Sequence, residues 1–184
     1  MLRVISGSLK GRILKGPKGL GFRPTTGRVK EFVFEYLKQD IRNAKVLDLF
    51  SGTGSLGIEA ISRGAEEVFF IEQALDHLSI LRNNLKDCDC LDRAIVMKGD
   101  VFSNLRHLGL QSKQFDIVLA DPPFKMNYHS RIVDTVGQCH VLKPDGLLLV
   151  EHEQHDMLAL KTDMSLIREK KCGHCIVSVY QKQE

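Results

Sequence analysis

Residues 46–57 read Val-Leu-Asp-Leu-Phe-Ser-Gly-Thr-Gly-Ser-Leu-Gly, and this stretch most limits what the chain can fold into. An apolar run of strand character, residues 46–50, passes through a glycine-rich turn into a helical pattern over residues 55–63. Glycines let a backbone approach a ligand closely, and a helix N-terminus offers unpaired N–H groups. A strand that feeds a helix through such a turn predicts a nucleotide-binding site in an α/β fold.

The turn also fits the pattern G-x-G-x-x-G from Gly52 to Gly57, and the acidic residue Glu72 follows about 20 residues later. That pattern is typical of dinucleotide sites, so a nicotinamide-dependent oxidoreductase is one interpretation. Asp48 argues against it, because a carboxylate at the end of the first strand would repel a pyrophosphate. S-adenosylmethionine carries an ammonium and a sulfonium, so the same carboxylate favours that cofactor.

Strand and helix patterns alternate after residue 43, which predicts a mainly parallel sheet with helices on both faces. The fold class is therefore α/β in three layers, with the sheet between two layers of helices. A closing hairpin at the C-terminus implies that one late strand runs antiparallel, and residues 1–15 read as a short β-hairpin arm. We expect strands at 46–50, 67–71, 94–98, 115–120, 147–151, 165–170 and 176–180, helices at 29–37, 55–63, 74–86 and 129–141, a short helix after 100 and a turn at 143–146.

Positive charge is concentrated at the N-terminus. Residues 1–38 hold nine Lys or Arg and two Glu, a net charge of +7 in a chain whose total is +3. This basic head predicts a polyanionic partner, with a merely solvated basic face as the alternative. We divide the chain into a basic arm and helix, residues 1–40, and a cofactor-binding core, residues 41–184. Arg23, Arg28 and Lys30 surround the predicted helix start and are suited to hold a phosphate. The candidate RNA-binding residues are Lys10, Arg12, Lys15, Arg23, Thr25 and Arg28.

Composition excludes several classes of protein. The 184 residues suit one domain with a sizeable core, and 43% of them are hydrophobic. We expect a cytoplasmic protein, because neither an apolar run of bilayer length nor a signal-peptide pattern is visible. The five cysteines, an odd number, argue against a disulfide framework. We read C-x-x-C at residues 172–175 as a hairpin turn and find no zinc pattern in His-Glu-Gln-His at 152–155, so we expect no metal.

Acidic residues stand at the ends of four successive predicted strands. They are Asp48, Glu72, Asp100 and Asp121. In open α/β sheets ligands bind outside the carboxyl ends of the strands, so these acids should share one site. Glu72 suits the ribose hydroxyls, Asp100 suits the adenine amine beside the N–H of Val101, and Asp48 would face the methionine end. A helix-capping role is the alternative for Asp100 alone.

The sequence Asp121-Pro122-Pro123-Phe124 follows the fourth strand. Two prolines fix the backbone, so the Pro122 carbonyl can point into the site beside the Asp121 carboxylate. Together they form two acceptors for one –NH2 group and turn its nitrogen toward a sulfonium methyl. Phe124 supplies a flat face for a base, which must be unstacked to reach the pocket. A rigid structural loop is the alternative interpretation.

These motifs, together with Arg-Pro-Thr-Thr at residues 23–26, resemble the RsmD family over nearly the whole chain. The resemblance implies an S-adenosylmethionine-dependent enzyme that methylates a guanine N2 amine of 16S ribosomal RNA in the assembled small subunit. It also implies a seven-stranded Rossmann-like fold, and we expect a monomer. Phe124 stands where tyrosine is more frequent, and Gly27 where an acid is common. The implied catalytic residues are Asp121, Pro122, Pro123 and Phe124, and the cofactor-binding residues are Asp48, Phe50, Ser51, Gly52, Gly54, Glu72, Gln73, Asp100 and Val101.

Other functions remain open at this point. A DNA adenine-N6 methyltransferase would use the same D-P-P-F sequence, although such enzymes usually carry a separate recognition domain that residues after 151 could not supply. A non-catalytic RNA-binding module is a second possibility, but binding alone does not require two acceptors aimed at one amine. A nicotinamide-dependent oxidoreductase is the third.

Overall fold

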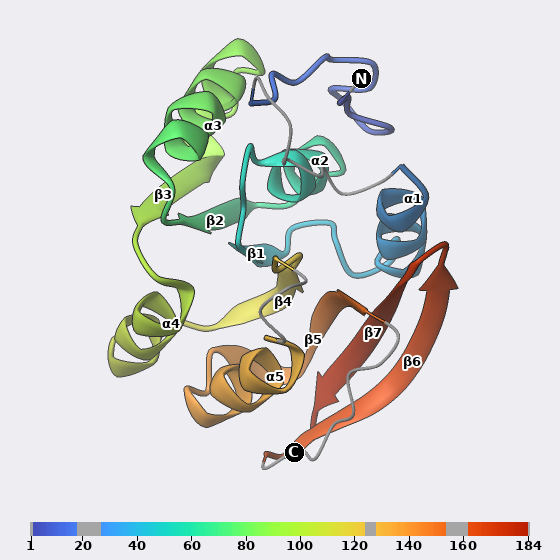
Figure 1. The fold of residues 1–184 in the computed structure, drawn as a ribbon, viewed down its shortest axis with the longest axis vertical. Coiled ribbons are helices and arrows are strands. Elements are labelled where there is room, and N and C mark those ends of the chain that lie inside the picture. Colours follow the sequence, from blue (N-terminus) through green and yellow to red (C-terminus); the bar gives the residue numbers. More distant parts are fainter. Residues whose placement is uncertain (1, 18–26, 124–127, 154–161, 184) are drawn as a thin grey trace.

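The computed structural model describes residues 2–17, 27–123, 128–153 and 162–183, and seven strands in these ranges form one sheet. They are β1 (Lys45–Leu49), β2 (Glu67–Glu72), β3 (Ala94–Lys98), β4 (Phe115–Ala120), β5 (Leu142–Glu153), β6 (Met164–Cys172) and β7 (Cys175–Lys182). Their order is β3-β2-β1-β4-β5-β7-β6, and β7 alone among them runs antiparallel to its neighbours (Figure 1). The predicted seven-stranded, mainly parallel sheet is confirmed.

Helices cover both faces of the sheet. Apolar side chains of α1, α2 and α3 share one hydrophobic cluster with one face, and those of α4 and α5 share a second cluster with the other. None of the helices in the described ranges is long and apolar enough to cross a membrane. The helices are α1 (Gly27–Tyr36), α2 (Ser55–Ser62), α3 (Leu75–Asp87), α4 (Val101–Leu110) and α5 (His129–Gln138), with a short 3-10 helix at Leu91–Arg93.

The order in which successive strands join the sheet reverses at β1. The chain runs outward from β1 to β2 and β3, and then returns so that β4 pairs with the other side of β1. The carboxyl ends of β1 and β4 therefore flank a topological switch point, where crevices form in open α/β sheets. Both the glycine turn after β1 and the Asp-Pro-Pro sequence after β4 lie at this point.

The predicted turn at residues 143–146 is wrong. These residues belong to β5, which begins at Leu142, and the pairing of β4 with β5 shifts register between Phe115 and Ile117. At this shift Asp145 has a left-handed backbone conformation, with φ 59°. Gly146 permits a close contact there, because a Cβ at this position would lie 2.9 Å from the Lys143 carbonyl oxygen. A bulge inside a strand thus uses the same residue types as a turn between elements.

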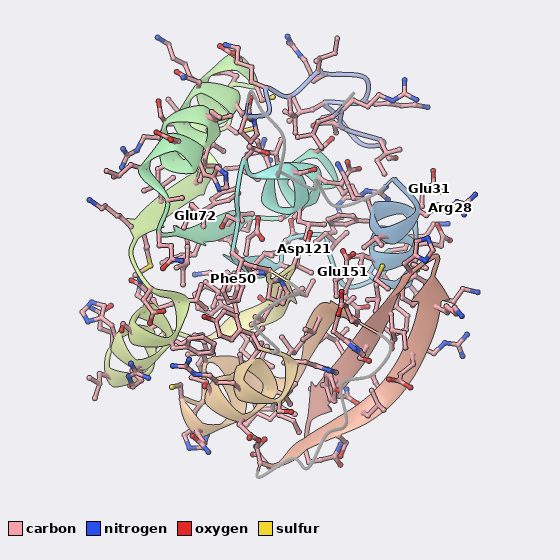
Figure 2. All side chains as sticks on the ribbon, viewed as in Figure 1. Arg28, Glu31, Phe50, Glu72, Asp121 and Glu151 are labelled. Atoms are coloured by element: carbon pink, nitrogen blue, oxygen red, sulfur yellow. The ribbon has the colours of Figure 1, made fainter. Side chains whose placement is uncertain are left out.

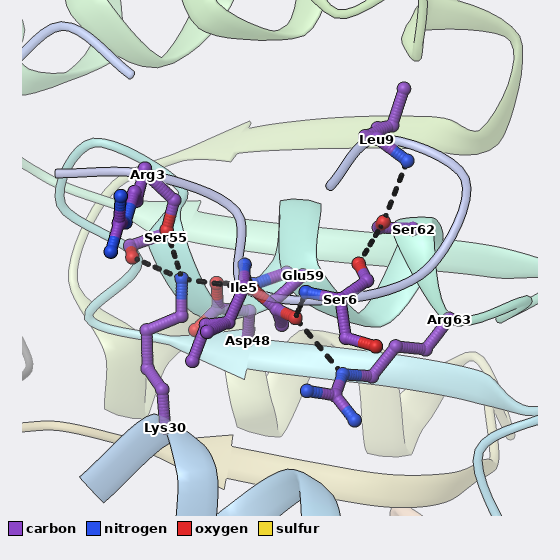
Figure 3. Close-up of polar contacts among 11 residues, drawn as sticks. Arg3, Ile5, Ser6, Leu9, Lys30, Asp48, Ser55, Glu59, Ser62 and Arg63 are labelled. Carbon is purple, nitrogen blue, oxygen red and sulfur yellow. Dashed lines mark hydrogen bonds and ion pairs between the residues drawn. The ribbon is translucent and has the colours of Figure 1, made fainter. Parts of the chain in front are cut away.

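The N-terminal arm, residues 2–15, folds back on itself and docks on α2. It has the hairpin form that we expected, with one antiparallel bridge between Arg3 and Ile13. The N–H groups of Ile5 and Ser6 donate to the Glu59 carboxylate over 2.8 and 3.0 Å (Figure 3). Gly7 permits the close approach, because a Cβ there would lie 1.9 Å from the Ser62 carbonyl oxygen. Backbone bonds therefore hold the arm against the core.

Lys30 does not belong to a phosphate site, contrary to the prediction. Its side chain is buried, and its Nζ lies 3.1 Å from Glu59 Oε2 and 3.2 Å from Ser55 Oγ (Figure 3). Burial lowers the pKa of the Lys30 ammonium, and the neighbouring Glu59 carboxylate acts in the opposite direction. Lys30 instead joins α1 to α2 and to the arm, where its Nζ donates to the Arg3 carbonyl over 3.1 Å.

The C-x-x-C sequence forms the turn between β6 and β7, as predicted. Cys172 and Cys175 are paired residues at the end of the hairpin, and both thiols are free. Gly173 has φ 72°, which a tight turn requires and which other residues rarely adopt.

Candidate active site

Four carboxylates gather at the carboxyl edge of four neighbouring strands, β2, β1, β4 and β5. Glu72 ends β2, Asp48 lies one residue before the end of β1, Asp121 follows β4 directly, and Glu151 lies near the end of β5. The alternation along each strand assigns all four to the face that α1, α2 and α3 cover. Figure 2 shows Glu72, Asp121 and Glu151 along this edge.

Asp48 lies at the centre of this row and is the most buried of the predicted acids, with 1% of its surface exposed. Its Oδ2 accepts from the N–H of Gly57 over 2.9 Å. A Cβ on Gly57 would lie 2.2 Å from the Phe70 ring, so α2 can approach Asp48 only with glycine at this position. Burial raises the pKa of Asp48 to about 8; the Gly57 bond opposes this, and the nearby Asp121 and Glu72 carboxylates add to it.

The raised pKa makes stability depend on pH. Asp48 ionises near pH 4 in the unfolded chain and near pH 8 in the folded one, so the wild type loses stability between these values. We expect Asp48→Asn to remove this loss and to gain roughly 5–6 kcal/mol over the wild type between pH 4 and pH 9, at about 1.4 kcal/mol for each unit of pKa. Urea denaturation across this range measures it, with the exposed Asp92→Asn as control. Parallel curves for wild type and Asp48→Asn would contradict the burial effect.

The glycine turn is held by contacts with its own strand, β1, and with α3. Phe50, Gly52 and Gly54 have φ of 57°, 54° and 84°, and a Cβ on Gly54 would meet the Leu81 side chain at 2.4 Å. Ser51 is buried, and its hydroxyl donates to the Asp48 carbonyl over 2.6 Å. The turn is therefore shaped before any ligand arrives, as tight binding to a preformed site requires.

Glu72 ties the turn to β2. Its Oε2 accepts from the N–H of Gly52 over 2.8 Å, and its Oε1 accepts from the N–H groups of Gln73 and Ala74, also over 2.8 Å. His77 Nδ1 lies 3.7 Å away. Since an ionised carboxylate offers about four acceptor sites, Glu72 can order the turn and still accept from another donor. The predicted contact with ribose hydroxyls stays a prediction.

Asp100 has the capping role that was the alternative for it. The residue is exposed, and its Oδ1 accepts from the N–H of Ser103 over 2.9 Å at the start of α4. Val101 is the first residue of that helix and is buried. Asp100 thus differs from the buried acids of the central strands, and its contact with an adenine amine is untested.

The sequence analysis named Phe50 as a cofactor residue but missed the aromatic group that it forms beside the turn. Phe50 stacks on Tyr128 with ring centroids 5.7 Å apart, and Phe102 meets both rings edge to face. The guanidinium of Arg131 lies 3.6 Å from the centroid of the Phe102 ring. The group joins the end of β1 to the start of α5. Only the aromatic character of Phe102 in the first turn of α4 could have indicated it.

Asp121 opens the Asp-Pro-Pro sequence directly after β4, at the switch point beside β1. The residue is half-buried, Pro122 is buried and Pro123 is exposed. Its carboxylate lies close enough to Asp48 to raise the pKa of that group. Phe124 lies outside the described residues. The structure thus brings the predicted amine-binding residue Asp121 together with the predicted cofactor residue Asp48.

The predicted RNA-binding residues are distributed over several surfaces. Lys10 and Arg12 are exposed on the arm. Arg28 is exposed on α1, where Figure 2 labels it. Lys15 instead forms an ion pair with Asp87 of α3 over 2.6 Å. Arg23 and Thr25 lie outside the described residues. Lys10, Arg12 and Arg28 are therefore available to a polyanion without breaking an ion pair that the structure shows.

The sheet order, the glycine turn and the acids at the carboxyl edge define a methyltransferase with a Rossmann-like fold. A family model described as Conserved hypothetical protein 95 matches residues 2–181. The chain belongs to this family, the RsmD family of S-adenosylmethionine-dependent methyltransferases, as its motifs suggested.

Relatives match nearly the full length. A Haemophilus influenzae protein named Ribosomal RNA small subunit methyltransferase D is 35% identical and is matched over 98% of this chain and 93% of its own. The Escherichia coli K12 protein of that name is 33% identical, over 99% and 90%. A solved structure of the Escherichia coli methyltransferase yhhF superposes with a TM-score of 0.84 at 33% identity, covering 98% of this chain and 97% of that one. The family excludes a nicotinamide-dependent oxidoreductase.

Proposed function

We propose that this protein transfers a methyl group from S-adenosylmethionine to the N2 amine of a guanine in 16S ribosomal RNA, in the assembled small subunit. The observation that carries the proposal is the position of Asp121 at the switch point beside the buried Asp48. It sets an acceptor for a substrate amine next to an acceptor for a cationic cofactor. The Haemophilus influenzae and Escherichia coli relatives named Ribosomal RNA small subunit methyltransferase D support the choice of RNA.

The residues at the edge of the sheet fit S-adenosylmethionine. Asp48 and Glu72 are acceptors, and the N–H of Gly52 already donates to Glu72. A pyrophosphate would meet repelling carboxylates here, whereas an ammonium stabilises the ionised form of Asp48. We therefore assign Asp48 to the methionine end and Glu72 to the ribose. When bound, the cofactor supplies an electrophilic methyl group on a sulfonium.

The chain's own residues make the amine ready to react. A guanine amine is nearly non-basic, because its lone pair is delocalised into the ring. Asp121 and the Pro122 carbonyl accept its two hydrogens, which raises the electron density on the nitrogen and fixes its direction. With the cofactor bound, the nitrogen held in this way would take the methyl group as its bond to sulfur breaks, and one amine proton would leave to solvent. Positioning in line supplies much of the remaining rate.

Phe124 is proposed as the stacking face for the flipped base. Base–aromatic stacking contributes roughly 1–3 kcal/mol. Phe124→Tyr would keep the ring, and Phe124→Ala would remove it, so these two variants separate stacking from the remaining contacts of the loop.

Mass spectrometry of 16S ribosomal RNA from cells with and without this protein tests the proposal. We expect one N2-methylguanine that disappears without the protein and returns when purified protein and S-adenosylmethionine are added to small subunits. Parallel reactions with naked RNA identify which form is the substrate. Unchanged RNA modification would overturn the proposal, and N6-methyladenine in DNA would support the alternative enzyme.

The exposed cations of the arm lead to a prediction on binding. Reversing Lys10 and Arg12 to Glu should weaken RNA binding and reduce its salt dependence by about one unit of slope for each phosphate that the arm no longer neutralises. Cofactor affinity should stay the same, because both side chains are exposed on the arm. Filter binding at several salt concentrations measures the slope. Lys15 is left intact because it already forms an ion pair with Asp87 of α3.

The control is a double reversal of Lys86 and Lys113, which are exposed on the core and give the same change in net charge. If both double variants bind RNA equally well, the basic arm is only a solvated face.

A further inference from the structure

Asn84 joins two segments that lie far apart in the sequence, the N-terminal arm and the glycine turn. The residue lies in the last turn of α3, and only 1% of it is exposed. Its Oδ1 accepts from the N–H of Lys15 over 2.8 Å, and its Nδ2 donates to the Lys15 carbonyl over 3.0 Å. The same Nδ2 donates to the Thr53 carbonyl over 2.9 Å. Because an amide has two N–H donors and one oxygen, this single buried side chain is fully used in connecting the arm with the turn.

The second half of the glycine turn depends on α3. The first half is held from β2, which accepts the N–H groups of Ser51 and Gly52. The N–H of Gly57, which a helical bond would direct to the Thr53 carbonyl, donates to a carboxylate of β1 instead. Thr53 is buried, and its hydroxyl has no hydrogen-bond partner within the described ranges. The contact that fixes the peptide after Thr53 is therefore the one with Asn84.

The arm is bound to the core at two places, on α2 and on α3 (Figure 1). Glu59 accepts from the first limb of the hairpin, near residue 5, and Asn84 binds the second limb at Lys15. Leu14, directly before Lys15, is buried in the hydrophobic cluster on this face of the sheet. If the second limb left α3, the amide would lose two of its three hydrogen bonds inside the fold. A buried amide without partners is unfavourable, so the docked arm also fixes the group that holds the turn.

We propose that Asn84 is a positioning residue that couples docking of the arm to binding of S-adenosylmethionine at the glycine turn. This inference rests on the proposed function, which assigns the cofactor to the turn, and extends that site to the arm. The docked arm holds the amide, the amide holds the Thr53 carbonyl, and the turn keeps the shape that the cofactor meets. Such coupling is reciprocal, so bound cofactor stabilises the docked arm by the same factor. The arm thus serves the cofactor site as well as carrying the exposed cations Lys10 and Arg12.

The test is a double-mutant cycle in the full chain, measured as the Kd for S-adenosylmethionine by titration calorimetry. Leu14→Ala loosens the arm but keeps the Asn84 side chain, and Asn84→Ala removes the connection. We expect each single variant to bind the cofactor at least roughly 5-fold more weakly than the wild type. We expect the double variant to bind no more weakly than Asn84→Ala, because the arm then has no connection left to break.

The matched control is Leu142→Ala, which opens a cavity at the start of β5, the end of that strand away from the carboxyl edge. It should keep the wild-type Kd, since Leu142 belongs to the hydrophobic cluster on the other face of the sheet. If an alanine variant does not fold, Leu14→Val, Leu142→Val and Asn84→Ser replace the set, and we expect the same order of affinities.

The measurement needs no RNA, so its outcomes separate the two proposals. A wild type that does not bind S-adenosylmethionine refutes the proposed function. A wild type that binds it, beside a Leu14→Ala variant with the same Kd, refutes the coupling of arm and turn. If Leu14→Ala weakens binding by the same factor with and without Asn84, the coupling does not pass through this residue and the inference is wrong. Equal weakening by Leu142→Ala would also refute it, because general loss of stability would then account for the change.

Discussion

Asp121→Ala should reduce methyl transfer by roughly 10³-fold, while binding of S-adenosylmethionine stays nearly unchanged. The carboxylate accepts from the substrate amine and has no assigned contact with the cofactor. Asp121 also raises the pKa of Asp48, so its removal should favour the ionised form of Asp48 near neutral pH. Cofactor affinity at pH 7 should therefore equal or slightly exceed that of the wild type, which a general loss of structure could not produce.

Radiolabelled methyl transfer and titration calorimetry on the same preparations measure the two quantities. The control is Asp92→Ala, which changes an exposed acid in the short 3-10 helix before β3 and should behave as the wild type. Normal turnover by Asp121→Ala would remove the Asp-Pro-Pro sequence from the mechanism. Parallel losses of turnover and cofactor binding would instead reassign Asp121 to the cofactor.

Glu59→Ala should destabilise the fold by about 3–5 kcal/mol, because it leaves a buried ammonium without its counter-ion. The Glu59 carboxylate is fully buried and lies 3.1 Å from Lys30 Nζ and 2.9 Å from Arg63 Nε (Figure 3). It also accepts two N–H groups of the arm, from Ile5 and Ser6. The loss corresponds to about 6–20 °C in Tm at roughly 2–4 °C per kcal/mol for a chain of this size.

Thermal unfolding followed by circular dichroism measures this effect. Replacing both partners, Lys30→Met with Glu59→Leu, should recover a large part of the loss, since the uncompensated charge is then gone. Glu35→Ala breaks the exposed pair with Lys38 and should cost about 0.5 kcal/mol or less. A Glu59→Ala protein as stable as Glu35→Ala would show that the buried pair has no net effect. The arm should also become sensitive to proteases in Glu59→Ala, because two of its backbone bonds end on this carboxylate.

Part of the site could be predicted because its signals are local in the chain. Asp48 and the glycine turn are separated by a few residues, so strand, turn and helix could be assigned from neighbouring side chains. The acids Asp48, Glu72 and Asp121 share one edge because parallel strands place their carboxyl ends together, whatever the length of the connections. Fold class and strand direction follow from the same repetition of strand and helix patterns.

Glu151 also follows an apolar strand pattern, but the sequence analysis did not include it among the acids of the site. Its position beside Asp121 depends on the order of strands, which puts β5 directly next to β4. That order is decided by pairing over long distances in the chain, and no short pattern contains it. The aromatic group of Phe50, Phe102 and Tyr128 depends on the same kind of contact.

The sequence by itself determined the elements, the parallel sheet and the glycine turn, because each of these depends on the periodicity or backbone freedom of neighbouring residues. Only the tertiary structure decided that Lys30 is a buried ion-pair partner of Glu59 and that Lys15 pairs with Asp87. Which carboxylate a lysine meets depends on how the helices and the arm pack together. A lysine that the sequence assigns to a basic surface can therefore be a buried ion-pair partner in the fold, as Lys30 is.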